Sequence, residues 1–259
     1  MGGEQRVRVG ATSVLGRVAN AVAGLLPEPV LAGIVRRVYP RVEPELRRLA
    51  ELTTGGGIVL DVGAWYGPWS YRLRRHAART VAVEPNPRLA GVLRATLPGV
   101  EVVEAALGER ADSVRLWIPV AGKRREGIAS LTPSGEHSTT VRMVTLDSLG
   151  LTDLRLVKLD VEGHELAVLR GGEQTIRRDR PTLLVELEAR IQRIAPVVEL
   201  LERWGYTASV LVGDRWRDLA GFDLAGHQRD AAAALHQGLA RRAVWPRPRY
   251  VNLVRFRSG

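Results

Sequence analysis

Short apolar segments alternate with amphipathic segments along most of this chain, and this alternation restricts the fold more than any other feature. The apolar segments are short, aliphatic and bounded by turn residues, as buried parallel strands are. The main strands are expected at Ile58–Val62, Thr80–Val83, Val100–Val103, Leu154–Val161 and Thr182–Leu187. Alternating strands and helices bury a mostly parallel sheet between two helical layers. The sequence therefore predicts an α/β fold.

The remaining elements follow from the same patterns. Helices are expected at Pro68–Ala77, Pro87–Leu97, Glu165–Ile176, Ile191–Trp204 and Asp223–Arg242. Extended segments are expected at Ser113–Ile118 and Val141–Leu146, and late strands at Tyr206–Val212 and Tyr250–Phe256. The late strands leave no room for the usual right-handed crossovers that would keep every strand parallel. We expect a seven-stranded sheet whose last strand is antiparallel.

The first 52 residues are expected to form a helical extension or lid, and residues 53–259 the main domain. The apolar stretch Ala21–Tyr39 is interrupted by two prolines and ends in two arginines, so it is not a membrane span. Packing of these helices on the main domain is the preferred interpretation. The alternative is that Val14–Tyr39 lies on a membrane surface or on a partner.

Composition excludes several classes of function. The chain has no cysteine, which rules out disulfides, thiolate metal sites and a cysteine nucleophile. No secretory signal is apparent, and a cytoplasmic protein is expected. The net charge of +10 comes mostly from arginine. These arginines are scattered without interleaved aromatic residues, so nucleic-acid binding is not expected.

A cluster of acidic and basic residues stands where the fourth main strand meets its helix. Lys158, Asp160 and Glu162 alternate with apolar residues, so their side chains are expected on one side of the strand. Gly163 then breaks the strand, and His164 opens the helix. An interior strand carries charge only where something compensates it. This junction is a candidate reaction site.

A glycine-containing turn follows the first strand, and an acid follows the second. Gly63 and Gly67 let the backbone approach a ligand and expose helix N-terminal amides. Glu84 can accept hydrogen bonds from both hydroxyls of a ribose. Asp61 can hold the loop or reach the amino group of a methionine moiety. Together these residues indicate a nucleoside site, although the glycine spacing departs from the dinucleotide fingerprint.

Four ordered motifs, DVGAWYG, VAVEPNP, VTLDSL and KLDVEGHELAVLRGG, resemble those of FkbM-type S-adenosylmethionine-dependent O-methyltransferases. The resemblance covers roughly residues 57–190, with a weaker echo at Tyr250–Asn252. It implies a Rossmann-like class I methyltransferase fold with S-adenosylmethionine as methyl donor. The cofactor positions that it implies are Asp61, Gly63, Ala64, Trp65, Gly67, Glu84, Pro85, Glu104, Ala105, Ala106 and Asp160.

The glycine loop departs from the family pattern at two positions. The family usually has asparagine where this chain has Trp65, and a small aliphatic residue where it has Tyr66. These aromatic side chains either wall the cofactor or acceptor pocket or pack against the N-terminal helices. For nearby Trp69, packing is the preferred interpretation.

Methyl transfer to a hydroxyl requires a base or a divalent cation that removes the hydroxyl proton. His164 is the first choice for the base, with Asp160, Lys158 and Glu162 as further catalytic candidates. Asp160 with Glu186 or Glu188 offers oxygen ligands for Mg²⁺. The alternatives are structural. Lys158 can pair with Asp160 or Glu186, acids can cap the helix, and His164 can bond a carbonyl.

The leading hypothesis is an O-methyltransferase that acts on a small-molecule hydroxyl, in a sugar, glycolipid or other secondary metabolite. A loop at Gly122–Glu136 resembles a family segment near the acceptor and is expected to be a lid. One alternative is an RNA or protein methyltransferase, although the Asn/Asp-Pro-Pro-aromatic signature of amino-group methylation is missing after the fourth strand. Another is a non-catalytic binding protein of the same fold. The sequence leaves the oligomeric state open, a homo-oligomer included.

Overall fold

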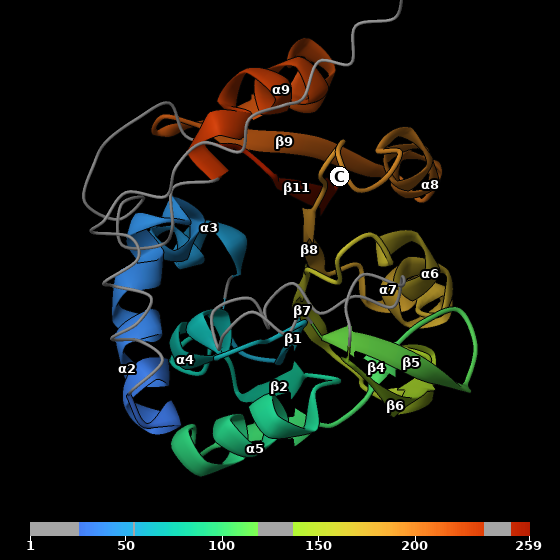
Figure 1. Cartoon of the computed structure of the whole chain (residues 1–259). Helices are drawn as coiled ribbons and strands as arrows, with labels where there is room; N and C mark the ends of the chain where they lie inside the picture. The colour runs from blue at the N-terminus through green and yellow to red at the C-terminus, as the bar shows by residue number, and fades with distance from the viewer. Residues whose placement is uncertain (1–25, 54, 119–136, 236–249) are drawn as a thin grey trace, which may run out of the picture.

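The computed structural model describes residues 26–53, 55–118, 137–235 and 250–259. Within these ranges the main sheet has eight strands in the order β10-β9-β11-β8-β7-β1-β2-β3, with helices on both faces (Figure 1). The strands are β1 (Ile58–Val62), β2 (Arg79–Val83), β3 (Val100–Val103), β7 (Leu154–Leu159), β8 (Thr182–Glu186), β9 (Tyr206–Val212), β10 (Arg215–Asp218) and β11 (Leu253–Ser258). Strands β3, β2, β1, β7 and β8 pair in parallel.

The antiparallel last strand is confirmed, because β11 runs antiparallel to both β8 and β9. The sheet nevertheless has one strand more than predicted. Gly213 adopts a positive φ of 64° and turns the chain back, so β10 forms a hairpin with β9. The guanidinium of Arg255 lies 3.8 Å from the ring centre of Trp216 and covers this added edge. Arginine stacking on an aromatic ring stabilises such an exposed strand.

A small three-stranded sheet, in the order β4-β6-β5, lies beside the main sheet. Its strands are β4 (Ala106–Leu107), β5 (Asp112–Ile118) and β6 (His137–Val144). The two predicted extended segments correspond to β5 and β6, whereas β4 is an addition. The predicted lid loop, including Ala129–Leu131, lies outside the described residues.

Helices surround the main sheet with bounds close to those predicted. They are α2 (Glu28–Val38), α3 (Leu49–Leu52), α4 (Pro68–Leu73), α5 (Pro87–Thr96), α6 (Glu165–Arg170), α7 (Glu173–Asp179), α8 (Ala195–Arg203) and α9 (Leu224–Leu235). The single helix predicted after β7 is divided into α6 and α7 at Gly171–Gly172. A Cβ on Gly171 would lie 2.0 Å from the carbonyl oxygen of Gly108, so the break brings the backbone against the small sheet.

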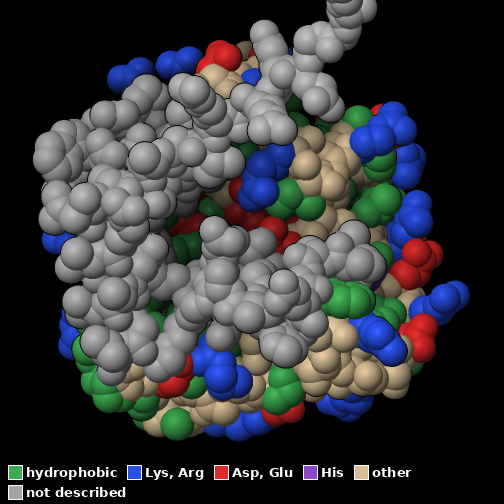
Figure 2. Space-filling model, viewed as in Figure 1, with side chains coloured by type: hydrophobic (Ala, Val, Ile, Leu, Met, Phe, Trp, Pro, Cys, Tyr) green, Lys and Arg blue, Asp and Glu red, His purple; other side chains and the backbone are tan. Residues whose placement is uncertain are grey.

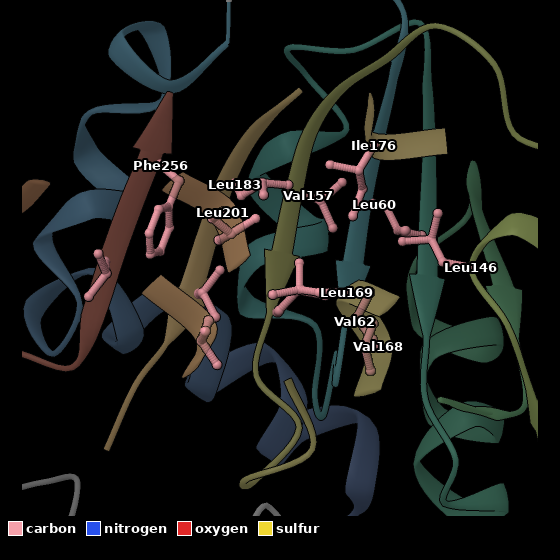
Figure 3. Close-up of a cluster of buried hydrophobic side chains, with 14 of the residues drawn as sticks. Leu60, Val62, Leu146, Val157, Val168, Leu169, Ile176, Leu183, Leu201 and Phe256 are labelled. Carbon is pink, nitrogen blue, oxygen red and sulfur yellow. The ribbon is translucent and has the colours of Figure 1, made fainter. Parts of the chain in front are cut away.

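Each face of the main sheet has its own apolar core. On one face, Leu60, Val157 and Leu183 pack against Leu169 of α6 and Leu201 of α8 (Figure 3). On the other face, a cluster joins the sheet to α4 and to the N-terminal segment; its members are Val59, Leu156, Leu184, Leu253, Trp69, Leu73, Leu46, Leu49 and Leu52. Successive strand residues thus alternate between the two cores. Because Asp61 and Lys158 follow Val59 and Leu156 by two positions, their side chains face the side that the N-terminal segment covers.

The N-terminal segment is fastened to the main domain by polar contacts as well. The buried guanidinium of Arg36 donates to the carbonyl oxygen of Tyr66 over 2.8 Å and to the hydroxyl of Thr96 over 2.6 Å. Arg88 forms an ion pair with Glu28 at the start of α2. Among the residues that the structure describes, none of the helices combines the length and hydropathy needed to cross a bilayer.

Candidate active site

A buried lysine stands at the centre of the charged junction. Lys158 on β7 lies opposite Asp61 on β1 in the parallel register. Its Nζ lies 2.9 Å from Asp160 Oδ2, 3.4 Å from the carbonyl oxygen of Gly63 and 4.0 Å from Asp61 Oδ1. Burial alone lowers the pKa of Lys158, but the charges of Asp160, Asp61 and Glu43 outweigh it and raise the pKa above its usual value. Lys158 is therefore an ammonium group, which does not favour it as a base.

Asp160 and Glu186 form a carboxyl pair that shares a hydrogen bond. Burial raises the pKa of Asp160, but the charge of Lys158 outweighs it and lowers the pKa. Burial, and next the charge of Asp160, raise the pKa of Glu186 well above its usual range. It follows that Asp160 is ionised and that Glu186 keeps the proton between them.

The glycine loop packs directly on this pair. Gly63 has a φ of 75°, and a Cβ there would lie 1.8 Å from the carbonyl oxygen of Asp160. Gly67 also has a φ of 75°, and a Cβ there would lie 2.6 Å from Leu97. Only glycine fits either position without displacing a neighbour. The predicted cofactor loop and the predicted reaction site are thus one structural unit.

Asp61 holds the loop, which is one of the two roles considered for it. Its Oδ2 accepts hydrogen bonds from the amide of Ser70 over 2.9 Å and from the hydroxyl over 2.5 Å. Its Oδ1 accepts no hydrogen bond and faces the ammonium of Lys158. Burial raises the pKa of Asp61, against the opposing charge of Lys158.

Glu84 lies beside the loop with both carboxylate oxygens turned to backbone amides. Oε2 accepts from Trp65 N over 2.8 Å, and Oε1 accepts from Asn86 N over 2.9 Å. Burial nevertheless raises the pKa of Glu84 to about 7. A carboxylate oxygen has two lone pairs, so each oxygen keeps capacity for a ribose hydroxyl. Pro85, next in the chain, is half-buried at the same turn.

The third cofactor segment follows β3 at the same edge. The amide of Glu84 donates to the carbonyl oxygen of Val103, which brings the ends of β2 and β3 together. Ala105 and Ala106 are buried there, whereas Glu104 is partly exposed and pairs with Arg94 at 2.7 Å. Ala105 and Ala106 therefore supply the apolar side chains at this edge, and Glu104 points to the surface beside Arg94.

The aromatic residues of the loop pack toward the N-terminal segment. The ring of Trp65 lies 5.9 Å from that of Tyr39 and 4.9 Å from that of Tyr66. Tyr66 is buried with the apolar face of α2. Trp69 is buried as expected, and its Nε1 donates to Glu43 over 2.6 Å. Trp65 has a φ of 52°, a conformation that asparagine adopts readily and tryptophan rarely, so its packing must offset backbone strain.

Three carboxylates converge at the end of β7 and β8. Ligand oxygens of Asp160, Glu162 and Glu186 all lie within 4.8 Å of one another. Glu188, which was predicted in place of Glu162, pairs instead with Arg190 and accepts from Asn252 over 3.4 Å. Burial raises the pKa of Glu162 to about 8, with further contributions from Asp160 and Glu188. The trio therefore differs from the predicted set by one member.

A shallow hollow opens next to these acids, and Figure 2 shows red acidic side chains gathered in a recess of this face. Its lining residues are Glu162, Gly163, Glu165, Glu186, Glu188, Ile191 and Gln192. Glu165 caps the turn at the end of β7 by accepting from the amides of Val161 and Gly163. Glu165 thus holds the turn that precedes α6, and no side-chain cap hydrogen bond is formed at the start of that helix among the described residues.

His164 occupies the N-cap position of α6 and is absent from the lining of this hollow. Burial lowers its pKa, and its Nε2 is enclosed without a hydrogen-bond partner. The imidazole is accordingly neutral near pH 7, as a base must be. The described contacts do not join His164 to the Lys158–Asp160–Glu186 group.

Sequence patterns did not reveal two further members of this site, Tyr39 and Glu43. Both come from the N-terminal segment, far from any strand end, and no local motif marks them. Asn252, in the weakly matching terminal segment, donates to Glu186 and joins β11 to the site. Only the three-dimensional packing identifies these partners.

The strand order, with a glycine loop after β1 and an acid directly after β2, is that of the class I methyltransferase fold. The Methyltransferase FkbM domain model matches residues 61–208, and the chain belongs to this family. That match covers more than half of the 259 residues and includes the loop, Glu84, the Lys158–Asp160 pair and the acids after β8.

Two of the solved structures that match this chain do so at low sequence identity. The methyltransferase FkbM from Methylobacillus flagellatus is 16% identical, with a TM-score of 0.45; the match covers 78% of this chain and 58% of that one. The present chain thus spans little more than half the length of that relative. A precorrin-6y C5,15-methyltransferase from Geobacter metallireducens is 12% identical, with a TM-score of 0.42; the match covers 97% of this chain and 93% of that one. No curated protein matches the sequence significantly.

Proposed function

We propose that this methyltransferase transfers the methyl group of S-adenosylmethionine to a hydroxyl of a sugar, glycolipid or other secondary metabolite. One observation carries the proposal: the ionised Asp160, with its partner Glu186, lies directly beside the glycine loop. An alcohol is a poor nucleophile until its proton is removed. A carboxylate that already shares a proton with its neighbour can accept a hydrogen bond from such a hydroxyl.

The residues divide into two groups around the point of transfer. Gly63, Ala64, Gly67 and Glu84 would bind the nucleoside part of the cofactor, as proposed from the sequence. Asp160 would orient the acceptor oxygen, and Lys158 would keep Asp160 ionised. Displacement at a sulfonium methyl requires alignment and exclusion of water, and no covalent enzyme intermediate is needed. His164 remains our proposed base because its imidazole is neutral; it does not line the hollow, so the His164→Ala test below decides its role.

Calorimetry with S-adenosylmethionine is the first test. We expect binding in the micromolar range, weakened at least tenfold in Glu84→Gln, which removes one acceptor from the ribose position. Wild-type protein that binds no cofactor at millimolar concentration would contradict the proposal. A panel of hydroxylated glycosides, incubated with methyl-labelled cofactor, should then give alkali-stable methyl ethers. Label found only on amine or carboxyl groups would contradict transfer to a hydroxyl.

The role of His164 has its own test. His164→Ala should lose at least a hundredfold in turnover, since general base catalysis contributes about 10²–10⁴-fold. Its cofactor affinity should be unchanged. Turnover within a few-fold of wild type would exclude His164 as the base and favour Asp160 acting directly.

A divalent cation is a further part of the proposal. The oxygens of Asp160, Glu162 and Glu186 suit Mg²⁺, which prefers carboxylate and water ligands. When bound, the ion would lower the pKa of an acceptor hydroxyl. Calorimetric titration with Mg²⁺ should show binding that Glu162→Gln abolishes. Absence of binding, together with full activity after EDTA treatment, would remove the metal from the mechanism.

A further inference from the structure

A buried glutamine of the late helix α9 is hydrogen-bonded to backbone next to the acidic group. Gln228 exposes only 4% of its surface. Its Nε2 donates to the carbonyl oxygen of Leu187 over 2.7 Å and to that of Val251 over 3.0 Å. Its Oε1 accepts from the amide of Ala189 over 2.8 Å. Both polar atoms of the side chain are therefore bonded to backbone, and together they join two segments that are far apart in sequence.

These two segments lie past the ends of their strands. Leu187 follows β8, and Val251 precedes β11. Buried backbone groups outside a regular ladder need other partners. His227, next to Gln228 on α9, supplies a further one, because its Nε2 accepts from the amide of Val251 over 3.2 Å. Both backbone polar groups of Val251 are thus bonded to side chains of consecutive α9 residues.

The joined segments carry two side chains of the active-site group. Glu188 stands within the bonded segment 187–189 and lines the hollow. Asn252 directly follows Val251, and its Nδ2 donates to Glu186 and, over 3.4 Å, to Glu188. Gln228 therefore holds the backbone from which both of these side chains project.

The bond from Asn252 restricts the carboxyl group of Glu186. Glu186 is a member of the carboxylate trio with Asp160 and Glu162. Its Oε1 accepts from Asn252 Nδ2. While one carboxyl oxygen is fixed in this way, the plane of the group and the direction of its other oxygen are restricted. A shift of Asn252 would therefore change how Glu186 meets Asp160.

The pattern of bonds explains why residue 228 carries an amide. Two backbone carbonyls need donors and one backbone N–H needs an acceptor, and a glutamine side chain supplies all three from one planar group. A glutamate would turn a carboxylate oxygen toward the two carbonyls, and a methionine would make none of the three bonds. The amide satisfies buried backbone groups, and through the same bonds it holds Glu188 and Asn252.

We propose that Gln228 is a positioning residue of the acceptor side: by joining the segment 187–189 to Val251, it holds Asn252 against Glu186. The family match ends at residue 208, so α9 lies outside it. None of the described residues of α9 lines the hollow, so the helix acts on the site only through this backbone. The inference rests on the proposed role of Asp160 and Glu186 toward the acceptor.

The composition of the chain provides a spectroscopic probe of this link. Asparagine occupies three positions, Asn20, Asn86 and Asn252. Labelling of the full-length protein with ¹⁵N-asparagine therefore gives three side-chain amide signals, and Asn252→Ser identifies that of Asn252 by its loss. Hydrogen exchange of this side-chain amide reports how firmly Asn252 is held on Glu186, and it needs no knowledge of the acceptor.

Gln228→Met removes the three bonds with little change in volume and should accelerate exchange of the Asn252 side-chain amide about tenfold. Arg180→Met is the matched control. Arg180 also donates from its side chain to two backbone carbonyls, those of Trp204 over 3.1 Å and Gly205 over 3.2 Å, but it precedes the opposite end of β8. Its replacement should leave exchange of the Asn252 amide within about twofold of wild type.

Activity provides the second measurement. With an acceptor from the glycoside panel, Gln228→Met should lower kcat about tenfold and leave the Kd of S-adenosylmethionine within about twofold. Arg180→Met should leave both constants within about twofold of wild type. A purely structural role would lower the folded fraction, which urea unfolding measures, without lowering kcat per folded molecule.

Equal exchange of the Asn252 amide in Gln228→Met and Arg180→Met would overturn the inference, and so would faster exchange with an unchanged kcat. If Gln228→Met does not fold, Gln228→Asn decides the matter, because its shorter side chain cannot reach both segments at once. Wild-type exchange in that variant would again overturn the inference. Faster exchange in Gln228→Met, in a protein whose wild type methylates no hydroxyl, would instead refute the proposed function alone.

Discussion

Replacement of Glu84 by glutamine tests the electrostatics of the cofactor edge. Burial raises the pKa of Glu84 from its ordinary value of 4.5 to about 7. Between these values the folded protein keeps a proton that the unfolded chain has lost. Stability therefore falls as the pH rises through this window, and the loss is complete above about pH 7. Full ionisation lowers the free energy of unfolding by about 3 kcal/mol, of which about 2.5 kcal/mol develops between about pH 5 and pH 8.

Glutamine removes this dependence and introduces a constant cost. Its amide oxygen still accepts from one of the two backbone amides, Trp65 N or Asn86 N, and the other loses its partner at about 1–3 kcal/mol. Urea unfolding without added cofactor, followed by the fluorescence of the six tryptophans, gives the free energy of unfolding of both proteins at about pH 5 and about pH 8. Between about pH 5 and about pH 8 the wild type should lose about 2.5 kcal/mol of unfolding free energy that Glu84→Gln keeps. Glu43 and Glu162 ionise in both proteins and cancel. Parallel pH curves would refute the reasoning.

The remaining predictions concern the glycine loop and the N-terminal helix. Gly63→Ala should abolish cofactor binding and lower the melting temperature, because its Cβ would lie 1.8 Å from a backbone oxygen. Gly91→Ala, on the open face of α5, should instead stabilise the protein by about 0.5–1 kcal/mol. Calorimetric melting distinguishes the two variants. Arg36→Ala should lower the free energy of unfolding, measured with urea, by about 2–4 kcal/mol, because the buried guanidinium donates to Tyr66 and Thr96. Arg37→Ala, at the exposed neighbouring position, should change it by less than about 0.5 kcal/mol.

The sheet could be predicted from sequence because its strands are short apolar runs with distinct ends. Their bounds agree within a few residues, and the antiparallel last strand followed from topology. The additional strand β10 was missed because Arg215–Asp218 is polar and exposed on an edge, where no apolar alternation develops. The division of the helix after β7 was missed because glycine pairs are tolerated within helical patterns, and only contact with Gly108 forces the break.

The site was predictable where its residues follow strand ends, and not where they come from elsewhere. Lys158, Asp160 and Glu186 meet because parallel strands end at one edge of the sheet. Glu162, which has a positive φ of 51°, takes the place in the carboxylate trio that was predicted for Glu188. Strand alternation placed Glu162 on the side of Asp160, but it also placed Glu186 and Glu188 on one side and could not decide which acids meet. Tyr39 and Glu43 lie more than 100 residues from Lys158 in sequence, and their contacts with Trp65 and Trp69 become visible only in the folded chain.

The position of Asp160 links the two halves of the reaction. Its carbonyl oxygen occupies the space that a side chain on residue 63 would fill, and its carboxylate contacts Lys158 and Glu186. One residue thus fixes the cofactor loop by its backbone and serves the acceptor side by its side chain. A shift of the loop must move the carboxylate as well, because the two groups are separated only by the bonds of one residue. Asp160→Asn should therefore preserve cofactor affinity and abolish turnover, whereas any side chain at position 63 should impair both. Calorimetry and product formation measured on the same samples would separate these outcomes, and loss of cofactor binding in Asp160→Asn would contradict the division of roles.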